Sequence, residues 1–201
     1  MSYPATFEAD YIERRSRLTV FFRLLLIIPI GIWAYVLGIV ASILVLISWV
    51  VIVITGRFPA PLYEFVSGYT RFLTRLVAYG SLLCDRYPSF GLSDDGEYPI
   101  RMRFTGPLER YSRLKTLFRL ILAIPILIMR YVMQLLLEIG AFAAWFVILV
   151  IGRMPRGLFD VMVLANSYTA RSDAYIYLLT ETYPPFQDEH TRAAGTEAPG
   201  L

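Results

Sequence analysis

Residues 24–54 read LLLIIPIGIWAYVLGIVASILVLISWVVIVI, a run of 31 positions without a formal charge. A second apolar stretch, Leu120–Ile151, is interrupted only by Arg130 and Glu138. Apolar runs longer than about 18 residues are typical of membrane-spanning segments. The 201-residue chain is 57% hydrophobic and only 17% charged, which leaves too little polar surface to cover two such stretches in water. The sequence therefore predicts a mainly α-helical integral membrane protein.

The two apolar stretches belong to a tandem duplication. Residues 13–90 align with residues 109–186 without a gap, and 31 of the 78 aligned positions are identical. A repeat of this kind indicates that the repeated unit is also the structural unit. We expect a first repeat at 1–92, a second repeat at 93–187 and a disordered tail at 188–201, because the tail is small and polar without periodicity.

Each apolar stretch is too long for one upright crossing of a bilayer. A helix of 31 residues would be about 46 Å long at about 1.5 Å per residue, against a hydrocarbon core of about 30 Å. Two interpretations remain: a long kinked helix in each repeat, or a transmembrane helical hairpin with legs near 18–35 and 37–54. The hairpin is favoured, because 18 of the 19 basic residues lie outside the apolar stretches and two crossings per repeat place them on one side. This predicts a multi-pass protein of the cell (inner, cytoplasmic) membrane with four crossings and both termini in the cytoplasm.

A polar stripe distinguishes the second apolar stretch from the first. Arg130, Gln134 and Glu138 are spaced four residues apart, so they share one face of a helix. In the hairpin interpretation this stripe lies near the apex, where a charge can reach the headgroups.

Short alternating segments precede both apolar stretches. In residues 98–104 the apolar positions 100, 102 and 104 alternate with arginines, and residues 3–10 match the pattern more weakly. These segments could pair into a small two-stranded β cap, with Arg101 and Arg103 opposite Glu8 and Asp10.

A Gly-Arg-x-Pro motif follows each apolar stretch, at 56–59 and 152–155, and it is typical of a helix stop. After it, residues 65–83 and 159–179 have helical spacing of apolar residues. Each of these segments is either an amphipathic helix in the membrane interface or a helix packed in the protein core.

Seven arginines at predicted helix ends or on these helices are candidate interfacial anchors and lipid headgroup contacts. Arg57 and Arg153 lie in the stop motif, where a helix stop with an interfacial anchor is favoured over a phosphate-binding role. The seven are Arg23, Arg57, Arg71, Arg75, Arg119, Arg153 and Arg171.

The combined motifs resemble a known family. A Ser-Arg start, an apolar run with Ile-Pro, the Gly-Arg-x-Pro stop, an Arg-x-x-x-Tyr helix and a closing Tyr-Pro-x-Phe are similar to the bacterial membrane family DUF 4389. The resemblance covers most of residues 3–186 as two copies. Family members often carry histidine after Ile-Pro, where this chain has Ile30 and Ile126, so any role of that histidine is absent here. The resemblance implies a membrane location and a two-repeat architecture, and it implies no activity.

The sequence contains little that could support catalysis. The single histidine, His190, lies in the predicted tail, and the single cysteine, Cys84, lies among apolar residues. We therefore expect no enzyme, no catalytic or metal site and no cofactor. A net charge of +3 is too small to indicate nucleic-acid binding.

Two functions remain open. The first is an accessory or scaffold component of a membrane complex, with membrane lipids and a membrane-protein partner or a second copy as partners. The alternative is binding or transport of a lipid or small solute in a groove between the two pseudo-symmetric repeats.

Overall fold

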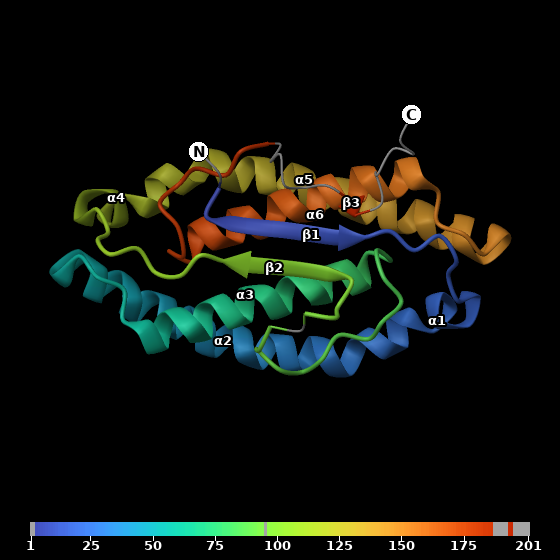
Figure 1. Cartoon of the computed structure of the whole chain (residues 1–201), viewed down its shortest axis with the longest axis horizontal. Helices are drawn as coiled ribbons and strands as arrows, with labels where there is room; N and C mark the ends of the chain where they lie inside the picture. Colours follow the sequence, from blue (N-terminus) through green and yellow to red (C-terminus); the bar gives the residue numbers. More distant parts are fainter. Residues whose placement is uncertain (1–2, 95, 187–192, 195–201) are drawn as a thin grey trace, which may run out of the picture.

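A computed structural model of the chain describes residues 3–94, 96–186 and 193–194. It is mainly helical, with one small sheet (Figure 1). In chain order the elements are β1 (Ala5–Asp10), α1 (Arg17–Phe21), α2 (Arg23–Thr55), α3 (Ala60–Gly80), β2 (Ile100–Phe104), α4 (Arg113–Leu117), α5 (Arg119–Ile151), α6 (Arg156–Ile176) and β3 (Ala193–Ala194).

The two apolar stretches form single continuous helices. Helices α2 and α5 contain 33 residues each, and both are long and apolar enough to cross a membrane. The predicted break near residue 36, and with it the transmembrane hairpin, is wrong. No proline follows Pro29 before the end of α2, and Gly38 alone does not stop the helix because its hydrogen-bonded ladder continues through it.

The helical hairpin of each repeat lies one element later, between the long helix and the next one. Gly56 and Gly152 end α2 and α5 with φ of 74° and 76°, a left-handed conformation that glycine adopts without strain. Pro59 and Pro155 then cap the start of α3 and α6. The Gly-Arg-x-Pro motif is therefore the tight turn of an antiparallel helix pair, and its role as a helix stop is confirmed.

The predicted two-stranded ribbon is present. Strands β1 and β2 are antiparallel, with Glu8 opposite Arg101 and Thr6 opposite Arg103. Arg101 forms ion pairs with Glu8 at 3.0 Å and with Asp10 at 2.9 Å. The apolar side of the ribbon is buried and the charged side faces outward.

One difference from prediction concerns the tail. Ala193 and Ala194 form the short strand β3, parallel to β1, so the sheet order is β2-β1-β3. The free edge of β1 offers backbone groups that a passing segment can pair with. The remainder of the tail, including His190, lies outside the described residues.

The helices form two layers beneath the ribbon. On α3, Thr74 contacts Met102 of β2, with 3.6 Å between Oγ1 and Sδ, whereas Phe72 packs with Ile30 and Leu37 of α2. Residues 72 and 74 lie on nearly opposite sides of a helix, so α3 is sandwiched between the ribbon and α2. Helices α3 and α6 therefore form a middle layer, which agrees with the packed-core interpretation of these segments.

The two repeats interlock through their first residues. Helix α1 packs against α5, and α4 packs against α2. The Trp49 indole N–H of α2 donates to the Thr116 carbonyl at 2.8 Å, and the Arg17 guanidinium donates to the Val150 carbonyl at 3.0 Å. Helices α2 and α5 are antiparallel, with the start of each repeat at the end of the other long helix (Figure 1).

Candidate functional site

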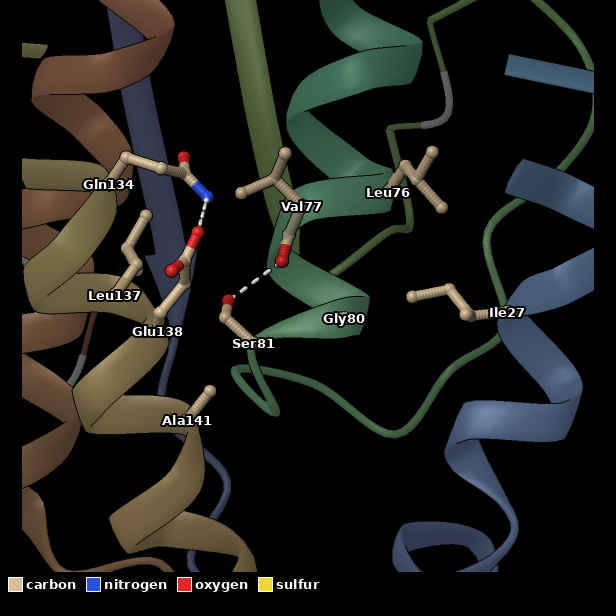
Figure 2. Close-up of a pocket in the computed structure, with 9 residues that line it drawn as sticks. All are labelled: Ile27, Leu76, Val77, Gly80, Ser81, Gln134, Leu137, Glu138 and Ala141. Carbon is tan, nitrogen blue, oxygen red and sulfur yellow. Dashed lines mark hydrogen bonds between the residues drawn. The ribbon is translucent and has the colours of Figure 1, made fainter. Parts of the chain in front are cut away.

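A groove between the two repeats is the main candidate site. Its volume is about 330 Å³, and side chains from three helices line it (Figure 2). Helix α2 contributes one of these residues and α5 contributes four. The other four come from α3 and the position just after it. The lining residues are Ile27, Leu76, Val77, Gly80, Ser81, Gln134, Leu137, Glu138 and Ala141.

The polar groups of the groove face each other, with Gln134 and Glu138 on α5 and Ser81 at the end of α3 (Figure 2). The Gln134 Nε2 donates to the Glu138 Oε1 at 3.3 Å, and the Ser81 hydroxyl donates to the Val77 carbonyl at 2.7 Å. This leaves the second oxygen of Glu138 and the lone pairs of Ser81 available to a ligand. Within the described parts of the chain, Glu138 has no cationic partner.

The pseudo-symmetric counterpart of this groove is filled. Gly80 and Ser81 correspond to Ile176 and Tyr177 in the second repeat. The Tyr177 ring lies 6.0 Å from the Tyr69 ring and packs against the cluster between α2 and α3. The groove therefore follows from small residues that the first repeat has and the second lacks.

A size exchange accompanies this difference. Ile27 approaches Gly80 so closely that a Cβ atom at position 80 would lie 2.9 Å from the Ile27 Cδ1. The corresponding pair in the second repeat is Ala123 and Ile176, so the large residue has changed helices. In each repeat one large and one small residue pack against each other. Only in the first repeat is the small residue on the shorter helix, α3, which leaves space next to Ser81.

Arg130 of the predicted polar stripe does not line the groove. Its guanidinium forms an ion pair with Asp173 of α6 at 2.7 Å, between Nε and Oδ1. The Asp173 side chain is 8% exposed. Burial raises the pKa of the Asp173 carboxyl, and attraction to Arg130 opposes that rise. The stripe is therefore divided into an ion pair and a groove wall.

Four of the predicted headgroup arginines are buried and bind backbone or side chains of the protein instead. Arg23 donates to the carbonyls of Tyr79 and Cys84, which end the α3 region, and pairs with Asp85 at 2.7 Å. Arg119 donates to the corresponding carbonyls of Tyr175 and Thr180. These contacts tie the start of each long helix to the end of its partner helix.

The other two buried arginines lie on the middle layer. Arg75 donates to the Gly91 carbonyl at 2.7 Å, and Arg171 donates to the Ser167 hydroxyl at 3.2 Å. Burial leaves Arg23, Arg75, Arg119 and Arg171 no path to a headgroup, so for these four the prediction of headgroup contact is wrong.

The remaining three candidate arginines are more accessible. Arg71 is half-buried, 5.9 Å from the centre of the Phe104 ring. Arg57 is exposed at the end of α2, and Arg153 is exposed at the end of α5, where it pairs with Glu13 at 3.3 Å. Headgroup contact at these three positions stays a prediction.

Comparison with known proteins places the chain in one family. The family described as "Domain of unknown function (DUF4389)" matches residues 17–91 and 113–187, as two tandem copies. The chain belongs to the DUF4389 family. No curated protein and no solved structure matches it.

The two DUF4389 copies coincide with the two helical hairpins and leave the ribbon strands outside the matched ranges. The groove lies between the copies and takes residues from both. The difference between the open groove and its filled counterpart therefore arises from sequence differences between the two copies.

The thiol of this DUF4389 protein is not positioned for chemistry. Cys84 is buried, and its sulfur lies 3.1 Å from the Tyr98 hydroxyl. Burial raises the pKa of the Cys84 thiol and so keeps it protonated. Among the described residues, no three His, Cys, Asp or Glu side chains could hold a metal ion.

The sequence interpretation did not identify Asp173, Gly80 and Ser81 as site residues. For Asp173, the internal alignment contains the signal that could have found it. Positions 34 and 77 are alanine and valine, whereas positions 130 and 173 are arginine and aspartate, a joint change from an apolar pair to an opposite-charge pair. Joint changes of this kind are typical of residues in contact.

Proposed function

We propose that this DUF4389 protein embeds in a lipid bilayer through α2 and α5 and binds an amphipathic small molecule in the groove between its repeats. One observation carries the binding proposal: the groove is open at one of two pseudo-symmetric positions and filled by Tyr177 at the other. Packing alone would favour filling both, because an unfilled apolar contact loses dispersion energy. The volume of about 330 Å³ is at the small end of ligand pockets.

The lining defines the chemistry of the ligand. Ile27, Leu76 and Leu137 offer an apolar wall, while Glu138 and Ser81 offer oxygen acceptors. A carboxylate beside apolar side chains and without a cation favours a ligand that brings a positive charge or a hydrogen-bond donor. The ligand class that fits is a short alkyl chain or lipid tail attached to an amine.

Photo-crosslinking tests this proposal on the full chain. The protein is reconstituted in phosphatidylcholine nanodiscs and exposed to decylamine that carries a diazirine in its alkyl chain. We expect labelled peptides from α3 and α5 around residues 76–81 and 134–141. Excess decylamine should reduce this labelling, because the site is saturable.

Two variants make the test specific. Ser81→Tyr places in the groove the residue that Tyr177 places in the second repeat, so it should remove labelling while the fold is retained. Glu138→Gln keeps the volume and removes the charge, so it should weaken the competition by decylamine at least about tenfold. Ser42→Ala, at the position that corresponds to Glu138, is the control and should not change labelling. Equal labelling in wild type and Ser81→Tyr would contradict the proposal.

An accessory or scaffold role is the second candidate, favoured by the exposed apolar faces of α2 and α5. Leu24, Tyr35, Leu120 and Tyr131 are each more than 70% exposed, and such faces fit a protein partner as well as lipid. Native mass spectrometry after gentle extraction from the host membrane separates the two functions. A stoichiometric protein partner supports the scaffold, and a retained, exchangeable small molecule supports the groove.

A further inference from the structure

The apolar faces of α2 and α5 lie on the side of the molecule away from the ribbon. Helix α3 contacts the ribbon through Thr74 and α2 through Phe72, and α2 exposes the side that points away from α3. The exposed apolar side chains continue along the whole of both long helices. On α2 they include Leu24, Ile28, Ile32, Ile39, Ile43 and Ile54, and on α5 Leu120, Ile124, Ile128, Ile139, Phe142 and Val150.

The ribbon runs along the same direction as the helices and lies over the middle of their length (Figure 1). Its outer side carries Glu8, Asp10, Arg101 and Arg103. If α2 and α5 stood upright across a bilayer, this charged side would lie at mid-depth and face lipid. Charged side chains at that depth are strongly disfavoured unless protein or water surrounds them.

The free edge of the ribbon leads to the same conclusion. In the described sheet, with order β2-β1-β3, the outer edge of β2 pairs with no strand. Backbone N–H and C=O groups at an open sheet edge cannot be satisfied within the hydrocarbon region. An upright orientation would place this edge there as well.

Basic residues lie at both ends of the molecule. Arg57 and Arg113 lie where α2 ends, and Arg17 and Arg153 lie where α5 ends. Because α2 and α5 are antiparallel, an upright orientation would place similar basic groups on both sides of the membrane. The bias that keeps basic residues on one side opposes this arrangement.

We propose that α2 and α5 lie in the plane of one leaflet, with their apolar faces toward the acyl chains and the ribbon in water. The proposal rests on the membrane location of the proposed function, but it does not depend on a ligand in the groove. The protein would then be monotopic, anchored by the apolar faces of its two long helices, and would cross the bilayer nowhere. The partner of this surface is lipid.

Cysteine accessibility in sealed vesicles tests the orientation. Four single substitutions are made in the full chain: Arg57→Cys and Arg153→Cys at opposite ends, Arg103→Cys on the ribbon and Ile39→Cys midway along α2. A membrane-impermeant maleimide is added before and after permeabilisation. Native Cys84 is buried and serves as the internal background.

The in-plane orientation predicts that positions 57, 103 and 153 react from the same side and that position 39 reacts from neither. Reaction of positions 57 and 153 from opposite sides, with position 103 unreactive, would show an upright crossing and overturn the proposal. Reaction of position 39 together with release of the protein by alkaline carbonate would overturn the membrane location itself. None of these outcomes depends on groove binding, so failure of the groove proposal would be seen only in the cross-linking experiment.

Discussion

Arg130 and Asp173 form a 2.7 Å ion pair between α5 and α6 at the two positions where the first repeat has Ala34 and Val77. The pair is more than a surface contact, since the Arg130 side chain is 32% and the Asp173 side chain 8% exposed. The first repeat shows that an apolar pair fits the same place, so the chain provides its own control for the contribution of the charges.

We expect Asp173→Val alone to destabilise the protein by about 3 kcal/mol, since removal of one partner leaves a partly buried charge without compensation. The double variant Arg130→Ala with Asp173→Val reproduces the first repeat and should recover to within about 1 kcal/mol of wild type. Denaturant unfolding in mild detergent, followed by tryptophan fluorescence, measures both. If the double variant is as unstable as Asp173→Val, the unpaired charge of Arg130 is not the cause of the lost stability.

The two turn glycines provide a second comparison. Both Gly56 and Gly152 have positive φ, which costs an L-residue about 1–2 kcal/mol. An added side-chain carbon would lie 3.5 Å from the Arg113 Nε at Gly56 but 3.1 Å from the Arg17 Nε at Gly152. We therefore expect Gly152→Ala to lower the free energy of unfolding more than Gly56→Ala, by the same unfolding measurement. The reverse order would contradict the role assigned to Arg17 in joining the repeats.

The thiol of Cys84 should be unreactive in the folded protein. Burial both blocks access and raises the pKa of the thiol, so the reactive thiolate is scarce at neutral pH. We expect no N-ethylmaleimide adduct near neutral pH by intact-protein mass spectrometry, and a complete adduct after denaturation. The Arg57→Cys variant, with an exposed second cysteine, is the positive control. Rapid modification of Cys84 in folded protein would show that the loop after α3 opens.

The ribbon and the repeats could be predicted from the sequence because each has a local pattern. Alternation at 98–104 predicts a strand, and the opposite charges of Arg101 and Glu8 predict its partner. The two Gly-Arg-x-Pro motifs predict where the long helices stop, and the gapless alignment predicts two equivalent halves.

The continuity of the long helices could not be predicted in the same way. Bilayer thickness limits the length only of an apolar helix that stands upright in the membrane, and the sequence does not state how a helix is oriented. The burial of Arg23 and Arg119 was also beyond local patterns, since the carbonyls that they bind lie 56 and 61 residues later, at the ends of α3 and α6 and just after them. The groove forms where small residues of α3 face residues of α5. This contact joins the two repeats, and residue spacing within one repeat does not predict it.

Polarised infrared dichroism of the protein in oriented bilayers tests the membrane orientation most directly. Helices α2, α3, α5 and α6 all run along one axis of the molecule, so the amide I dichroism reports a single direction (Figure 1). The in-plane orientation predicts helix axes nearly parallel to the bilayer surface. Axes close to the bilayer normal would show that α2 and α5 cross the membrane and would contradict the in-plane orientation.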